Sequence, residues 1–244
     1  MPDSEINIYP TTQQLAEVLA SEVASLAIGA ADNETVLNIA LSGGTTPKRL
    51  YEVLSEIYSE EIPWKNVHLF WSDERCVPPD HPESNYGFAR EYLLRSIPIP
   101  SRNVHFVKGE ADPEEEASRY SAEISEYVPF KNGVPRFDLI LLGLGSDGHT
   151  ASIFPDRMDL LTSESICAAV VNPENGQTRI TITGNVINNA EIVAFIATGV
   201  EKSGVVAAIL DEYDEADDYT AAYIYPEDGT LKWYLDEDAA TDLK

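Results

Sequence analysis

Apolar residues recur along the chain in two patterns, one spaced like the buried face of a helix and one continuous like a buried strand. The helical pattern comes first, between Thr11 and Gly29. Thr11 with Gln14 three residues later has the spacing of a helix cap. The apolar positions that follow at intervals of three and four residues are Leu15, Val18, Leu19, Val23 and Leu26. The chain is therefore expected to begin with a helix.

Beyond this helix, continuous apolar runs alternate with amphipathic stretches. The runs predicted as strands are residues 36–41, 67–71, 104–108, 138–145, 179–183, 192–198 and a last one from residue 231. The predicted helices lie around residues 50–58, 84–97, 112–127 and 202–210, with another after the last strand. Strands that are apolar throughout indicate a mostly parallel sheet with both faces covered. We predict a three-layer, doubly wound α/β fold of the Rossmann-like kind, with a small subregion.

Length and composition favour one domain in the cytoplasm. The chain has 244 residues, 43% of them hydrophobic, which is enough to bury a substantial core. No apolar run approaches the roughly 20 residues of a membrane span. Residues 1–10 have neither the basic region nor the apolar region of a secretion signal. We expect a single domain over residues 1–244, with no membrane partner and no obligatory protein partner.

The net charge of -26 narrows the range of partners. A surface this acidic repels nucleic-acid phosphates and anionic lipids, so neither is an expected partner. Two interpretations of the acidity stay open, an ordinary acidic protein and an adaptation to high salt. The acidic residues 211–219 lack the pattern of a calcium loop and are expected to form a surface turn without a site. Cys76 and Cys167 lack metal-ligand spacing, so we expect free thiols and no metal site.

Unusual residues follow several predicted strands, where ligands of parallel sheets bind. The first group is Ser42, Gly43, Gly44 and Thr45, between a strand and a helix. Its amides, hydroxyls and helix N-terminus would suit a phosphate, although the order differs from nucleotide and dinucleotide loops. The alternative is a plain tight turn in which Thr46 caps the helix.

Two further groups supply charge. Asp73, Glu74 and Arg75 open a long loop after the second strand, where they form either part of a site or an ordinary surface ion pair. Arg179 and Lys202 stand at the edges of later strands, where a lone cation is more often a surface residue. Together at one pocket rim they would neutralise a phosphate. Whether they meet is left open by the sequence.

The last group is the segment GLGSDGHTASIFP, residues 143–155, which follows the most apolar strand. His149 is one of four histidines in the chain and stands two residues after Asp147. Glycines on either side would let the chain turn and aim the imidazole into a cleft. The alternative is a histidine that is hydrogen-bonded within its own loop.

Taken together, these segments resemble a known family, the 6-phosphogluconolactonases. The resemblance runs in order through SGGTTP, WSDERCVP, DHPESNYG, GLGSDGHTASIFP, RITIT and TGVEK, and ends with LKWYLDEDAA. It spans nearly the whole chain. The wider superfamily also contains glucosamine-6-phosphate deaminases, ribose-5-phosphate isomerases and phosphosugar-sensing regulators, so the fold alone does not decide the function.

The resemblance implies hydrolysis of 6-phospho-D-glucono-1,5-lactone to 6-phosphogluconate, in the oxidative branch of the pentose phosphate pathway, with no cofactor or metal. His149 would act as general base on water. Asp147 would either orient the imidazole or hold the loop through backbone amides. Ser146 as a nucleophile is less favoured, because the GxSxG elbow is absent.

The remaining residues would hold the substrate. Arg75 would grip substrate oxygens or the developing oxyanion, and Asp73 would bond sugar hydroxyls. The phosphate would bind at Ser42, Gly43, Gly44 and Thr45, with Arg179 and Lys202 as countercharge.

Two alternatives within the superfamily are weaker. A deaminase has a glutamate shortly after the histidine, where this chain has Phe154. A phosphosugar sensor usually carries a DNA-binding segment ahead of the sugar domain, and only about ten residues precede the first predicted helix here.

Overall fold

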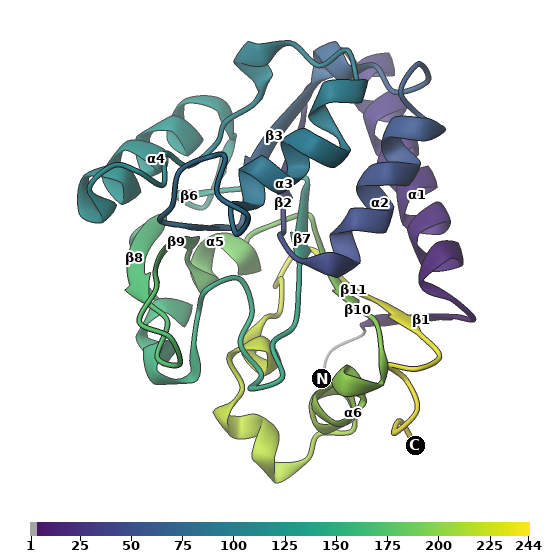
Figure 1. The fold of residues 1–244 in the computed structure, drawn as a ribbon, viewed down its shortest axis with the longest axis vertical. Helices are drawn as coiled ribbons and strands as arrows, with labels where there is room; N and C mark the ends of the chain where they lie inside the picture. The colour runs from purple at the N-terminus through teal and green to yellow at the C-terminus, as the bar shows by residue number, and fades with distance from the viewer. Residues whose placement is uncertain (1–3) are drawn as a thin grey trace.

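The computed structural model describes residues 4–244, apart from the side chain of Thr45. Within these residues a central sheet of six parallel strands runs through the molecule (Figure 1). In order across the sheet the strands are β1 (Glu5–Tyr9), β11 (Thr230–Asp236), β10 (Ile192–Ala197), β7 (Leu139–Leu142), β2 (Leu37–Leu41) and β3 (Val67–Trp71). The predicted parallel α/β architecture is confirmed.

Helices cover both faces of this sheet and give three layers (Figure 1). One face packs against α1 (Thr12–Asp32), α2 (Thr45–Glu56) and α3 (Asn85–Tyr92). The other packs against α4 (Pro113–Tyr127), α5 (Gly184–Asn188) and α6 (Ser203–Leu210). The sequence of strand β7 is apolar throughout because both of its faces are buried. Its leucines at 139 and 141 enter the first core, whereas Ile140 and Leu142 enter the second.

A second, smaller sheet is the subregion expected from the sequence. It is antiparallel, and its strands in order are β4 (Asp73–Arg75), β9 (Thr178–Ile182) and β8 (Cys167–Val171). A short hairpin joins β5 (Phe130–Lys131) to β6 (Val134–Pro135). The 3-10 helices η1 to η7 are Trp64–Asn66, Leu94–Ser96, Ser101–Asn103, Pro155–Leu161, Val200–Lys202, Asp214–Asp218 and Thr220–Tyr223.

Among residues 4–244, two predicted elements do not form, and two that do form are arranged differently from the expectation. The first described element is strand β1, ahead of the predicted helix, and its partner β11 lies at the other end of the sequence. Residues 104–108 form one isolated bridge to β3 instead of a strand. Strand β9 belongs to the antiparallel sheet. No helix follows β11 among residues 237–244, which form turns.

Helix α1 corrects the expectation that no apolar run approaches the length of a membrane span. Thr11 caps it as predicted, accepting a hydrogen bond from the Gln14 N–H at 3.2 Å. By length and composition alone, however, α1 is long and apolar enough to cross a membrane. Its buried side chains, Leu15 and Leu19 among them, pack in the core against the sheet. Helix α1 therefore serves as a core helix in this fold.

Candidate active site

A cavity of about 260 Å³ lies between the two sheets, beyond the ends of β2 and β7. Seven of the residues predicted for the site line it, and they come from five separate segments. They are Ser42, Gly43, Asp73, Arg75, His149, Arg179 and Lys202. The other cavity residues are Asn85, Gly143, Leu144, Gly145 and Ala151. The structure thus brings together all four groups that the sequence singled out.

His149 reaches the cavity on the loop that leaves β7. Its ring Nδ1 lies 2.5 Å from Asp147 Oδ1, and its backbone N–H donates to the same oxygen at 3.3 Å. The turn needs Gly145, since a Cβ there would lie 2.2 Å from the ring nitrogen. Thr150 Oγ1 donates to the Gly143 carbonyl at 2.9 Å and holds the base of the loop. Asp147 thus contacts both the ring and the backbone, so both roles considered for it have a geometric basis.

The environment of the pair favours an ionised carboxylate beside an accessible imidazole. Burial opposes ionisation of Asp147, but the hydrogen bond and charge of His149 outweigh it and lower the pKa of the carboxyl. The His149 side chain is 25% exposed, so it remains within reach of solvent in the cavity. On its other side the ring packs against Phe154, with centroids 4.9 Å apart. The histidine is fixed in place and still accessible.

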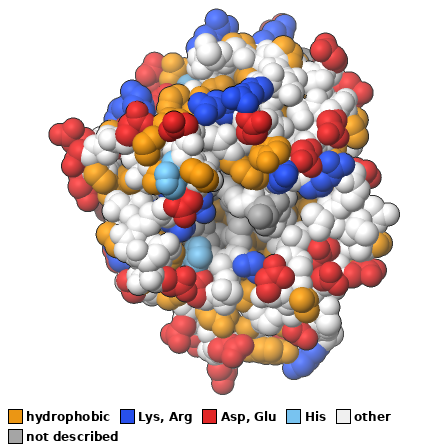
Figure 2. All heavy atoms as spheres, viewed as in Figure 1, with side chains coloured by type: hydrophobic (Ala, Val, Ile, Leu, Met, Phe, Trp, Pro, Cys, Tyr) orange, Lys and Arg blue, Asp and Glu red, His pale blue; other side chains and the backbone are white. Residues whose placement is uncertain are grey.

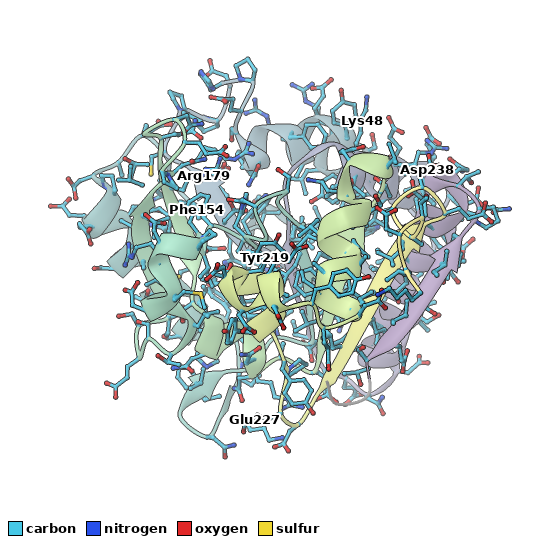
Figure 3. All side chains as sticks on the ribbon, turned by 90° about the horizontal axis from the view of Figure 1, so that it is seen from below. Lys48, Phe154, Arg179, Tyr219, Glu227 and Asp238 are labelled. Carbon is cyan, nitrogen blue, oxygen red and sulfur yellow. The ribbon has the colours of Figure 1, made fainter. Side chains whose placement is uncertain are left out.

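A later segment of the chain supports the His149 loop from behind. The ring of Tyr219 packs on Gly148, where a Cβ would lie 2.2 Å from the ring. The Ala221 N–H donates to the Gly148 carbonyl at 3.0 Å. Figure 3 shows Tyr219 on the yellow-green segment, with Phe154 and Arg179 on an earlier part of the chain. Residues 211–219 are therefore not merely a surface turn, because Tyr219 at their end supports the candidate site.

Two arginines stand side by side at the wall formed by the small sheet. Arg75 on β4 pairs in register with Arg179 on β9, which places both guanidinium groups at the cavity. Each has a buried Nε without a hydrogen-bond partner among the described residues. Burial lowers the pKa of Arg179, and the charge of Arg75 acts in the same direction, against the opposing effect of Asp73. Two adjacent guanidinium groups in one cavity wall would suit an anionic ligand.

Asp73 is only 6% exposed, and its carboxylate already has partners. Its Oδ2 accepts from Ser152 Oγ at 2.6 Å, and its Oδ1 accepts from Asn85 Nδ2 at 3.2 Å. Arg179 Nη1 lies 3.9 Å from Oδ2. These contacts make Asp73 an organiser of the cavity wall as well as a lining residue.

The predicted phosphate loop joins β2 to α2. Ser42 and Gly43 line the cavity, and Gly44 is the N-cap of α2 without a side-chain hydrogen bond. Thr46 does not cap the helix, since its hydroxyl lies 3.0 Å from the hydroxyl of Thr198. The predicted contribution of the Thr45 hydroxyl concerns a side chain outside the described part of the structure.

The acidic character of the surface continues around the site. Figure 2 shows Asp and Glu side chains spread over the face of the molecule that is seen in Figure 1, with Lys and Arg side chains between them. Arg75, Arg179 and Lys202 nevertheless gather at one cavity. An anionic ligand would thus find a local concentration of positive charge in a strongly negative protein.

Comparison with known proteins places this architecture in a family. The sequence profile of the family described as glucosamine-6-phosphate isomerases/6-phosphogluconolactonase matches residues 10–233. The chain belongs to this family. It is 40% identical over 233 residues to a 6-phosphogluconolactonase of Aggregatibacter actinomycetemcomitans, covering 95% of this chain and 97% of that protein.

Solved structures agree with this family assignment. The crystal structure of a protein named devB has a TM-score of 0.93 and 37% identity, covering 99% of this chain and 100% of that one. The 6-phosphogluconolactonase from Trypanosoma brucei has a TM-score of 0.88 and 30% identity, with 99% of each chain covered. The overall fold of the chain is thus shared with these two solved structures over nearly their whole length.

Sequence reasoning did not foresee two roles, that of Asn85 in lining the cavity and that of Glu74 in organising its wall. Asn85, at the start of α3, lies in the cavity wall although it stands ten residues beyond Arg75. Glu74, between the two predicted residues of β4, is 1% exposed and accepts the N–H groups of Arg75, Asn85 and Tyr86, each at 2.7 Å. The quoted motif SNYG contains Asn85, but nothing in its pattern showed where the side chain goes. A buried acceptor at Glu74 is likewise invisible in a charged tripeptide.

Proposed function

We propose that the chain hydrolyses 6-phospho-D-glucono-1,5-lactone to 6-phospho-D-gluconate in the oxidative branch of the pentose phosphate pathway. The observation that carries the proposal is His149, hydrogen-bonded to Asp147 at the edge of a cavity that Arg75, Arg179 and Lys202 also line. Relatives named 6-phosphogluconolactonase, similar over nearly the whole chain, support the same reaction.

His149 acts as the general base in this proposal. The Asp147 carboxylate accepts a hydrogen bond from the Nδ1–H of His149, which leaves Nε2 as the nitrogen that exchanges protons with water. Water loses a proton to Nε2 as its oxygen attacks the lactone carbonyl carbon. The imidazolium then returns that proton to the ring oxygen when the bond between it and the carbonyl carbon breaks. Asp147 stabilises the imidazolium while it exists.

Different residues bind the carbonyl group and the phosphate of the substrate. Arg75 faces the carbonyl oxygen and stabilises the oxyanion of the tetrahedral intermediate. Arg179 and Lys202 balance the phosphate, which binds at Ser42, Gly43, Gly44 and Thr45. Binding energy from the phosphate then serves to hold the carbonyl beside His149. Asp73 holds the wall and offers its remaining acceptor capacity to a sugar hydroxyl.

The proposal extends to the setting of the reaction. Residues 1–244 act as one domain, a view supported by a cavity that both sheets build. The unpaired thiols of Cys76 and Cys167 fit the reducing environment of the cytoplasm. The net charge of -26 argues against nucleic-acid or anionic membrane partners.

The test is to generate the lactone in place and follow its loss. A glucose-6-phosphate dehydrogenase supplies the lactone, and its disappearance is measured with and without the protein after subtraction of spontaneous hydrolysis. We expect acceleration proportional to protein concentration. A rate equal to the spontaneous one, with folded protein present, would refute the proposed activity.

A second assay tests the phosphate assignment. Arg179→Ala and Lys202→Ala should each raise KM more than they lower kcat, because each removes countercharge from the bound phosphate. Unphosphorylated gluconolactone is the control substrate, and its hydrolysis should respond much less to either substitution. An unchanged KM for the phosphorylated lactone in both variants would contradict the assignment.

A further inference from the structure

Asn85 is a buried amide whose orientation is fixed by its neighbours. The side chain is 3% exposed, and its Nδ2 donates to the Asp73 carbonyl at 2.9 Å and to Asp73 Oδ1 at 3.2 Å. Both partners are acceptors, so the nitrogen must face them and the oxygen must face the other way. The first residue of α3 thus holds an amide oxygen in a defined direction.

The direction of that oxygen is toward the phosphate loop. A Cβ built on Gly43 would lie 1.8 Å from Asn85 Oδ1, which places the oxygen directly over the glycine. Both residues line the cavity. No described residue donates a hydrogen bond to Asn85 Oδ1. Asn85 therefore offers a free acceptor at the cavity wall.

The backbone of Asn85 is anchored as firmly as its side chain. Its N–H donates to Glu74 Oε1 at 2.7 Å, and Ser84 Oγ lies 3.2 Å from Glu74 Oε2. A buried carboxylate thus ties the start of α3 to strand β4, next to Asp73 and Arg75. An acceptor held in this way cannot turn aside to suit a different ligand.

We propose that Asn85 is a specificity-determining residue whose amide oxygen accepts a hydrogen bond from one hydroxyl of the lactone ring. The inference rests on the proposed function and adds a substrate contact to it. A buried acceptor favours a ligand with a hydroxyl at that point and disfavours one without it, because the deoxy ligand leaves the acceptor unsatisfied. The loop residue opposite Asn85 must be glycine, since any side chain would displace the oxygen.

The experiment compares wild type and Asn85→Ala on four substrates. These are 6-phosphogluconolactone and its 2-deoxy, 3-deoxy and 4-deoxy analogues, prepared by oxidation of the corresponding sugar phosphates. In wild type, one analogue should have a kcat/KM lower than that of the parent by about 10-fold or more. In Asn85→Ala the kcat/KM of the parent lactone should exceed that of the same analogue by no more than about 2-fold.

Asn103→Ala is the matched control. Asn103 is equally buried, at 1%, and its Nδ2 likewise donates to backbone carbonyls, including that of Val67 at 2.9 Å, but it does not line the cavity. This variant should lose stability and keep the wild-type ratios for all four lactones.

The outcomes separate the contact from a structural role and from the activity itself. If Asn85→Ala lowers kcat/KM for all four lactones by the same factor, Asn85 is structural and the proposal is wrong. If wild type does not discriminate among the four, the proposal is also wrong. If wild type accelerates none of them, it is the proposed function that has failed.

Discussion

Histidine is hydrogen-bonded to a carboxylate at 2.9 Å or less in two places within the described chain. At one, His149 Nδ1 lies 2.5 Å from Asp147 Oδ1 on a loop that borders the cavity. At the other, His105 Nδ1 lies 2.9 Å from Glu123 Oε1 beneath the edge of the sheet. The contacts are alike, yet the surroundings differ in every respect that matters for chemistry.

The second pair is closed to substrate. His105 is 2% exposed, stacks on Phe70 with centroids 4.3 Å apart, and uses its other ring nitrogen on His68 at 3.0 Å. Both nitrogens of the ring are therefore occupied by protein. A general base needs one nitrogen held and the other free, so it is access that separates His149 from His105.

The largest expected effect comes from removing the accessible imidazole. His149→Ala should lower kcat for the lactone by about 10²-fold or more, with little change in KM, because the base acts on water and not on substrate binding. The measurement is steady-state hydrolysis of lactone generated in place.

His105→Gln is the matching substitution at the buried histidine. It should lower the melting temperature, because it breaks a buried hydrogen-bonded network, and should leave kcat within about 2-fold of wild type. A large loss of kcat in this variant, or none in His149→Ala, would show that the distinction drawn from access is wrong.

A smaller effect is expected from disturbing the carboxylate–imidazole contact without deleting either group. Gly145→Ala would put a Cβ 2.2 Å from His149 Nδ1 and 2.4 Å from Asp147 Oδ1, so the ring must move. We expect kcat to fall by about 10-fold, since a misplaced base is costly even over short distances.

Gly204→Ala is its control. Gly204 lies in α6, where a new Cβ meets nothing within 4 Å, and alanine there should raise stability by about 0.5–1 kcal/mol. Its kcat should be that of wild type. Equal activities for Gly145→Ala and wild type would mean that the loop accommodates the extra methyl group.

The smallest expected effect is a pH dependence of stability that belongs to His68, the neighbour of the buried pair. Burial, helped by His105 and Arg102, lowers the pKa of His68 to about 4, so the folded state favours the neutral ring. Its stabilising contribution is therefore complete above about pH 6.5 and is lost as the pH falls toward about 4. Melting temperatures between pH 7 and pH 4 should fall less steeply in His68→Gln than in wild type. His81→Gln, at an exposed loop position, is the control and should follow the wild-type curve.

The sequence predicted the parallel core and the site segments well because both depend on local pattern. Runs such as residues 138–142 are apolar throughout, and the loops that follow them must emerge at one edge of a parallel sheet. Strand β1 was missed because it is an edge strand with Ile6 and Ile8 about half exposed, and its pairing with β11 spans the whole chain. No local pattern encodes that partner.

Contacts within the site were harder to predict for the same reason. The register that sets Arg75 beside Arg179 joins residues 104 positions apart in an antiparallel sheet, whereas a parallel sheet was expected. The support of Gly148 by Tyr219 and the place of Asn85 in the cavity wall likewise depend on tertiary packing. Residue types indicated which chemistry was present, and only the fold showed which atoms were already satisfied.

The position of the cavity between the two sheets has one more consequence. The histidine follows a strand of the parallel sheet, whereas the paired arginines stand on the antiparallel one. In the proposed function, the general base and the two arginines therefore belong to different sheets. A change of sequence in the loop after β7 would then alter the proposed base and leave the arginine pair in place.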